Sequence, residues 1–155
     1  MGRVQKIWTR ILGAVIMARG AYSVFFSVLV MLALAGVFDI REFGPELSRY
    51  FASANPMIVV AWCVYACAYM VAGVAVVLDR RILALTLYSI GYAIDITLWL
   101  SVHSVSFNAD AAPAWASLAD LFFNVFDLAA LMILTYRVMV ASPVASSIHR
   151  LGSGK

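Results

Sequence analysis

The chain of 155 residues has the length of one ordinary domain, and its composition indicates that this domain lies in a membrane. Hydrophobic residues make up 65% and charged residues 12%, whereas soluble proteins average about 45–50% and about 25%. A soluble domain of this size leaves about a third of its extended-chain surface exposed and could not hide so many apolar side chains. The composition therefore excludes soluble enzymes, disordered chains and disulfide-stabilised secreted domains, and it predicts a polytopic membrane protein.

The first element that we expect is an amphipathic helix that precedes the first membrane span. Apolar residues between Val4 and Ile16 recur at helical spacing, and the basic residues fall on another face. Such a helix can lie on the anionic surface of the membrane. The alternative is a simple extension of the first span beyond the bilayer. The basic residues expected to face lipid headgroups are Arg3, Lys6, Arg10 and Arg19.

Four apolar runs are long enough to cross a bilayer, which takes about 20 helical residues. The expected spans are 20–38, 57–78, 82–102 and 121–140. Ten-residue segments of alternating hydrophobicity, typical of membrane β-barrels, are absent from the sequence. The sequence therefore predicts an all-α bundle of four transmembrane helices. Residues 1–142 are expected to form a single membrane domain and residues 143–155 a mobile tail.

The segments between the spans are too short to form domains of their own. Between the first two spans, the spacing of Leu47, Tyr50 and Phe51 predicts a short interfacial helix. Between the last two spans, Phe107 and Trp115 are expected to anchor the chain at the membrane surface.

The distribution of Lys and Arg predicts the orientation of the chain. With four crossings, nine basic residues fall on one side, and only Arg41 and Arg49 fall on the other. Short segments rich in Lys and Arg stay on the cytoplasmic side. We therefore expect both termini in the cytoplasm, with a bacterial inner (plasma) membrane as the setting. The net charge of +3 then reflects sidedness and does not imply a nucleic-acid partner.

Two acidic residues within the expected spans are the leading candidates for a functional site, because ionisable groups at membrane depth are costly. Asp95 lies 13 residues after Ile82, and Asp127 lies six residues after Leu121. At 1.5 Å per residue these positions are about 20 Å from the inner boundary and about 9 Å from the outer boundary. In a layer about 30 Å thick the two depths nearly coincide. Two antiparallel neighbouring helices could therefore bring the carboxyl groups together.

Other polar residues extend this candidate proton- or cation-binding site. Asp120, Asn124 and Asp127 follow one helical stripe. Tyr88, Tyr92 and Trp99 share a face with Asp95 and offer hydroxyl and indole donors. The expected spans place no Lys or Arg at this depth. Either one Asp carries a proton, or a cation fills the gap, or a partner protein supplies the positive charge. The alternative is that the acids are interhelical hydrogen-bonding residues without a further function.

The second span carries Cys63 and Cys67 one helical turn apart, with Met70 following. These sulfur ligands could hold a soft metal such as Cu(I), but buried thiols usually serve as apolar packing. No metal or other cofactor is therefore expected. On the third span Ser89, Ala93 and Thr97 form a row of small residues opposite Asp95, which predicts that this helix lies between two neighbours.

Catalytic motifs are absent from the sequence, which disfavours an enzyme. The first hypothesis is an accessory or assembly subunit, or a homo-oligomeric bundle, whose partners are the lipid bilayer and other membrane helices or further copies of the chain. The second hypothesis is a small transporter or sensor. In this alternative, Asp95 and Asp127 bind a proton or a cation from the outer side.

Overall fold

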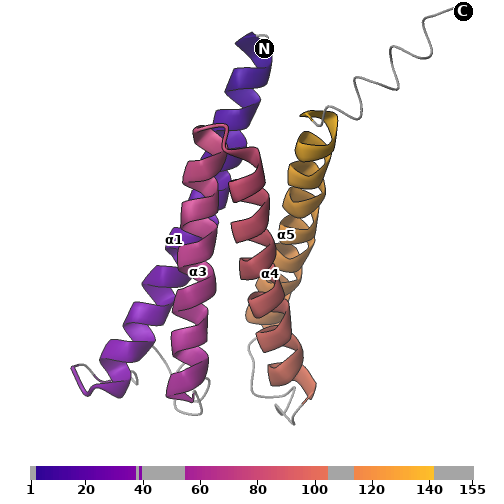
Figure 1. Ribbon diagram of the computed structural model, residues 1–155. Coiled ribbons are helices and arrows are strands. Elements are labelled where there is room, and N and C mark those ends of the chain that lie inside the picture. The colour runs from indigo at the N-terminus through magenta and orange to yellow at the C-terminus, as the bar shows by residue number, and fades with distance from the viewer. Residues whose placement is uncertain (1–2, 38, 40–54, 105–113, 142–155) are drawn as a thin grey trace, which may run out of the picture.

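The computed structural model describes residues 3–37, 39, 55–104 and 114–141, and every regular element in this part of the chain is an α-helix. The helices, labelled as in Figure 1, are α1 (Arg3–Leu34), α3 (Pro56–Val77), α4 (Arg81–Ser104) and α5 (Ala114–Ala141). All four are long and apolar enough to cross a membrane. The prediction of four spanning helices is confirmed, and the chain is an integral membrane protein by this criterion.

Some expectations concern residues outside the described part of the chain. They include the interfacial helix around Leu47, Tyr50 and Phe51, the anchor Phe107 and the tail from residue 143 onward. For Arg3, Trp115 and Asp120 the structure describes the helical backbone but not the side chains.

Helix α1 differs from the expected first span. The helix runs without a break from Arg3 to Leu34, and Gly36 just beyond its end has a φ of 73°, which suits the left-handed position after a helix. Residues 3–19 are therefore continuous with the first span in one helix, which favours the alternative of an extended span. At 32 residues, α1 is about 48 Å long. Its first turns project beyond the neighbouring ends of α3 and α4 (Figure 1).

Helices α3 and α4 form an antiparallel pair joined by a tight turn. Asn55 caps α3 by accepting a hydrogen bond from the Met57 backbone N–H at 2.9 Å, and Pro56 occupies the first turn. At the other end, the Arg80 N–H donates to the Ala75 carbonyl at 2.8 Å, and Asp79 adopts a φ of 55°. This is a Schellman motif with Asp in the place usually taken by Gly.

The closest helix packing is between α1 and α3, where three glycines let the backbones approach. An ideal Cβ on Gly73 would lie 2.8 Å from the Gly13 carbonyl oxygen, and one on Gly20 would lie 2.8 Å from the Ala66 carbonyl oxygen. No side chain fits between backbones at such distances. Apart from Arg19, the buried positions of α1 alternate in steps of three and four residues, which is the spacing of coiled-coil packing. These positions are Gly13, Ile16, Gly20, Ser23, Ser27 and Val30.

Helix α4 packs against α3 on one side and α5 on the other. The expectation that this helix has two neighbours is therefore confirmed, but the predicted small-residue row does not form the contact, because Ala93 and Thr97 are exposed. Gly91 instead faces the ring of Tyr69, and Tyr69 stacks on Tyr88 with ring centroids 4.7 Å apart. Aromatic packing therefore joins α3 to α4.

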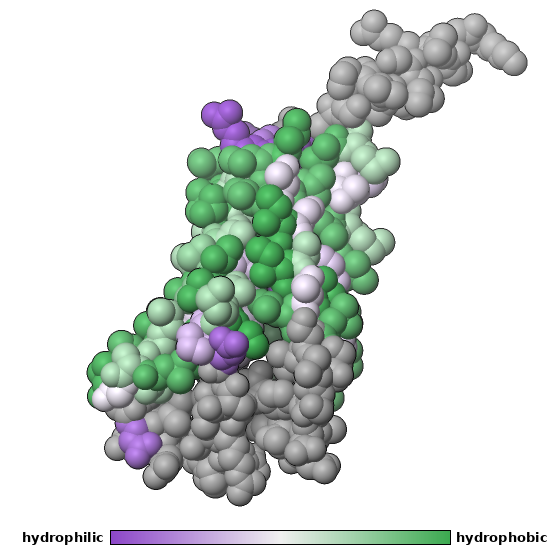
Figure 2. Space-filling model, turned by 60° about the horizontal axis from the view of Figure 1, so that its bottom comes forward, coloured by the Kyte–Doolittle hydropathy of each residue, from purple (hydrophilic) through white to green (hydrophobic). Residues whose placement is uncertain are grey.

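The outer surface of the bundle is strongly apolar. Large hydrophobic side chains such as Phe25, Val64, Ile90 and Met132 are exposed along all four helices. Hydrophobic residues cover most of the coloured face in Figure 2. In water such a surface would cause aggregation, whereas in a bilayer it contacts acyl chains.

One end of the bundle is rich in basic residues, and we call it the basic end. It contains the first turns of α1, the turn between α3 and α4, and the last turns of α5 (Figure 1). Its described charged residues are Lys6, Arg10, Asp79, Arg80, Arg81 and Arg137.

Candidate functional site

Three charged side chains from three helices meet in the interior. Nη2 of Arg19 on α1 lies 3.1 Å from Oδ2 of Asp95 on α4 and 3.4 Å from Oδ2 of Asp127 on α5. The side chains of Arg19, Asp95 and Asp127 are 8%, 17% and 0% exposed. The two acids predicted to lie at similar depth therefore do come together, bridged by one guanidinium nitrogen.

The position of Arg19 corrects its assignment as a lipid-facing residue. Arg19 is buried, whereas Lys6 and Arg10 of the same helix are exposed. Gly13 packs against Gly73 near the basic end of α3, and Arg19 follows six residues later. At 1.5 Å per residue, Arg19 is about 9 Å deeper in the bundle than that contact. Its side chain lies on the face of α1 that packs within the bundle.

Hydroxyl groups surround the two carboxyl groups. The Tyr88 hydroxyl donates to Oδ1 of Asp127 at 2.7 Å, and the Tyr69 hydroxyl lies 3.5 Å from Oδ2 of Asp95. Each acid thus contacts a tyrosine hydroxyl and the same arginine. Tyr69 comes from α3, so all four helices contribute a side chain to the cluster. Buried charges are tolerated only with such partners.

The guanidinium of Arg19 is also held by its own helix and by aromatic rings. Nη1 donates to the Ser23 hydroxyl one turn later, and the Tyr65 hydroxyl lies 3.4 Å from that same oxygen. The Arg19 Cζ lies 4.3 Å from the ring centroid of Phe123 and 5.7 Å from that of Tyr69. Cation–π contacts of this kind are stronger away from water. Nε of Arg19 is buried without a hydrogen-bond partner among the described residues.

The charges of the cluster do not cancel when every group is ionised. Arg19 contributes one positive charge, and Asp95 and Asp127 contribute two negative charges. The expectation that no basic side chain lies at this depth is wrong, because Arg19 neutralises one carboxylate. Low dielectric makes the remaining net negative charge unfavourable. One added proton would make the cluster neutral.

The other predicted site residues have different environments. Tyr92, Trp99 and Asn124 are half-buried on α4 and α5, and each lies on the same helix as one of the paired acids. Tyr88, which was expected to share the Asp95 face of α4, donates to an acid, and that acid is Asp127 on α5.

The sulfur-containing residues of α3 do not resemble a metal site. Cys63 is half-buried, and Cys67 and Met70 are exposed. Among the described residues no three His, Cys, Asp or Glu side chains are grouped in a way that could hold a metal ion.

Sequence reasoning missed Arg19, Ser23, Tyr65 and Tyr69 as members of the cluster. For Arg19 a signal was present, because residues 11–18 read ILGAVIMA and are all apolar or small. A first span that begins near Ile11 places Arg19 inside the membrane. The roles of Tyr65 and Tyr69 depend on which face of α3 packs against the other helices, and the evenly apolar sequence of α3 carries no such information.

No family model matches the sequence, and no curated protein or solved structure matches it significantly. The argument about function therefore rests on the buried cluster itself.

Proposed function

We propose that this integral membrane protein binds and releases a proton at the Arg19–Asp95–Asp127 cluster and works as a small proton-coupled transporter or sensor. The observation that carries the proposal is the imbalance of one guanidinium against two carboxyl groups in the interior of the bundle. Ionisable groups within membrane spans are functional candidates by default because of their cost. An ion pair that served only to join two helices would need one acid, whereas Arg19 contacts two.

A proton fits this site better than a metal or an organic cation. Nη2 of Arg19 contacts both carboxyl groups and so occupies the position that a bound cation would take between them. A second cation beside the guanidinium would be repelled. A proton needs no cavity, because it attaches to a carboxyl oxygen that is already present.

Asp95 is the group through which a proton would enter. Its side chain is 17% exposed, whereas the Asp127 side chain is fully buried. Tyr69 is bonded to Asp95, and its ring stacks on Tyr88, whose hydroxyl bonds to Asp127. With the termini in the cytoplasm, the exposed part of Asp95 would face the outer half of the membrane.

Protonation would change the contacts between helices, which is how a local event could affect the whole bundle. The ion pairs of Arg19 join α1 to α4 and α1 to α5. A proton on either acid converts one ion pair into a weaker hydrogen bond from the charged guanidinium to an uncharged carboxyl group. Helix α1 would then be held less firmly to the partner that has been protonated.

The test uses Asp95→Asn and Asp127→Asn, with Asp79→Asn as the matched control because Asp79 is an acid outside the cluster. The purified protein is titrated between about pH 4 and pH 9 while the infrared absorption of protonated carboxyl groups is recorded. We expect a buried carboxyl signal in the wild type and in Asp79→Asn, and its loss in each cluster variant. In proteoliposomes with an entrapped pH indicator, the cluster variants should also lose any proton flux.

The proposal fails if the wild type shows no buried carboxyl titration in this range, or if both cluster variants titrate like the wild type.

A second candidate function, an accessory or assembly subunit, is favoured by the projecting first turns of α1, where Val4, Ile7 and Trp8 are exposed. A reproducible larger complex after gentle detergent extraction, together with unaltered titration of both cluster variants, would support that alternative. Recovery of a lone functional monomer would contradict it.

A further inference from the structure

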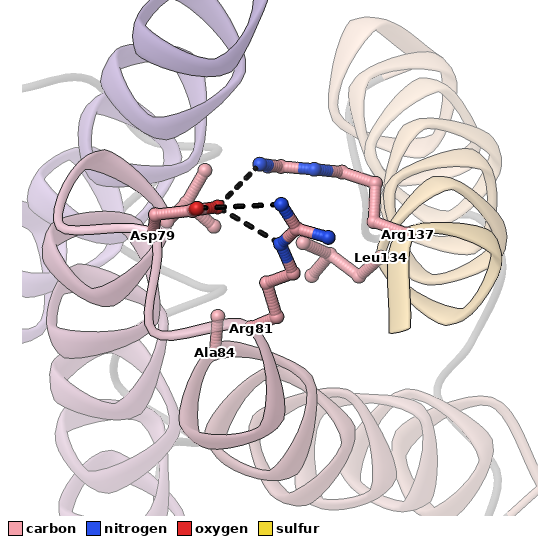
Figure 3. Close-up of a pocket in the computed structure, with 6 residues that line it drawn as sticks. Asp79, Arg81, Ala84, Leu134 and Arg137 are labelled. Carbon is pink, nitrogen blue, oxygen red and sulfur yellow. Dashed lines mark hydrogen bonds and ion pairs between the residues drawn. The ribbon is translucent and has the colours of Figure 1, made fainter. Parts of the chain in front are cut away.

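A second cluster of charges lies at the basic end, away from the Arg19 cluster. Asp79 accepts hydrogen bonds from Arg81 at 3.0 and 3.3 Å and from Nη2 of Arg137 at 3.1 Å. Figure 3 shows the two guanidinium groups reaching the same carboxylate, one from the start of α4 and one from α5. The Asp79–Arg137 bond thus links the α3–α4 turn to α5.

These charged groups lie next to a closely packed apolar layer of the bundle. The layer is formed by Val76, Ala84 and Leu134 from α3, α4 and α5, each at most 2% exposed. Figure 3 shows Ala84 and Leu134 close to the two arginines. Polar groups at the end of the bundle and apolar groups below them match the order of chemistry in a phospholipid, where the phosphate lies above the acyl chains.

The local electrostatics favour an anion. Two guanidinium groups face one carboxylate, which leaves one positive charge, and the exposed side chain of Arg80 is adjacent in the sequence. The N-terminus of α4 begins at Arg81 and adds a partial positive charge from its unpaired backbone N–H groups. Arg81 and Arg137 keep N–H groups in excess of those that bond to Asp79, and a guanidinium binds phosphate oxygens well.

We propose that the Asp79–Arg81–Arg137 cluster binds the phosphate of an anionic phospholipid, with Arg81 and Arg137 as ligands and the acyl chains along exposed apolar side chains of α4 and α5 such as Leu83 and Ile133. Basic pockets between transmembrane helices are suited to anionic headgroups. The α3–α4 turn marks the end of two spans, which is the level of headgroup phosphates in a bilayer. The exposed apolar side chains on α4 and α5 and the membrane setting favour a lipid phosphate over a free phosphate ion.

Asp79 competes with the phosphate for the same donors in this proposal. Its side chain is 45% exposed, so it can move away when a phosphate binds. Asp79→Asn removes the competing charge and keeps a residue type that tolerates the left-handed backbone conformation of this position. The substitution should therefore strengthen lipid binding, which is an effect that misfolding cannot imitate.

The experiment measures lipid retention by the full chain with native mass spectrometry, using phosphatidylglycerol against phosphatidylcholine. A high salt concentration, about 1 M with a Debye length of about 3 Å, suppresses attraction by distant exposed charges. We expect a preference for phosphatidylglycerol, about fivefold weaker in Arg137→Gln and about fivefold stronger in Asp79→Asn, as for one charge near a membrane surface. Arg10→Gln is the control, because Arg10 is exposed at the same end and lies outside the Asp79–Arg81–Arg137 cluster.

Three results would overturn the proposal. The first is an absence of preference for phosphatidylglycerol in the wild type. The second is equal retention by wild type and Asp79→Asn, or an equal loss in Arg137→Gln and Arg10→Gln. The third is displacement of the lipid by inorganic phosphate at a comparable concentration, which would show that the site binds phosphate ions and gains nothing from the acyl chains. Arg137→Lys provides a folded variant with the charge retained if Arg137→Gln does not assemble.

Discussion

Replacement of Arg19 by Met tests whether the buried guanidinium holds the bundle together. The substitution leaves an apolar side chain of suitable length and removes both ion pairs of 3.1 and 3.4 Å, the bond to Ser23 and the contact with Phe123. Removal of one partner from a buried ion pair costs about 3–5 kcal/mol, because the remaining charge is left uncompensated. Neutral hydrogen bonds between membrane helices average only about 0.6 kcal/mol. The two magnitudes are far enough apart to be distinguished.

The assay is reversible unfolding of the purified protein in mixed detergent micelles, with Arg10→Met as the matched control. Arg10 lies on the same helix and is exposed, so its substitution should change the free energy of unfolding by no more than about 0.5 kcal/mol. We expect Arg19→Met to lose about 3–5 kcal/mol. Addition of Asp127→Asn to Arg19→Met should restore part of this loss, because one uncompensated carboxylate is removed. Equal stability of Arg19→Met and Arg10→Met would refute the reasoning.

Two further predictions concern packing and pH. Gly73→Leu should destabilise the protein by about 1–3 kcal/mol, because a Cβ at Gly73 would lie 2.8 Å from the Gly13 carbonyl oxygen. The control in thermal unfolding is Val74→Leu, at the exposed neighbouring position. Equal melting temperatures of the two variants would contradict the close contact between α1 and α3. The hydrogen bond from Arg81, followed by the charges of Arg81 and Arg137, lowers the pKa of Asp79 below its ordinary value against a smaller opposing effect of desolvation. A lowered pKa in the folded state gives a contribution to stability that is present above the unfolded pKa of about 3.9 and is lost as the pH falls through the folded pKa. The wild type should therefore be more stable than Asp79→Asn by less than about 1 kcal/mol at neutral pH, and this difference should vanish in acid. A stability difference that grows as the pH falls would contradict the lowered pKa of Asp79.

The sequence predicted two of the three charged residues of the buried cluster. The depths of Asp95 and Asp127 follow from residue counts along two apolar runs and a fixed rise per residue, so their meeting could be anticipated. The role of Arg19 could not be reached in this way, because the first span was assigned to begin after the last basic residue. Basic residues near the ends of spans usually mark the membrane surface. In the sequence, an arginine that lies two turns inside a span looks the same as one at the membrane surface. The two cases can be distinguished only when the partners on other helices are known.

The composition and the apolar runs were sufficient to predict that this protein lies in a membrane and that four of its helices can span it. The reason is that transfer of backbone and side chains into a bilayer depends on local hydrophobicity. The tertiary structure decided which faces of those helices meet. On an apolar helix such as α3, whose residues are hydrophobic on all sides, no periodicity selects a face. The selection comes from the close approach of Gly13, Gly20 and Gly73 and from the charges that Arg19, Asp95 and Asp127 must neutralise together.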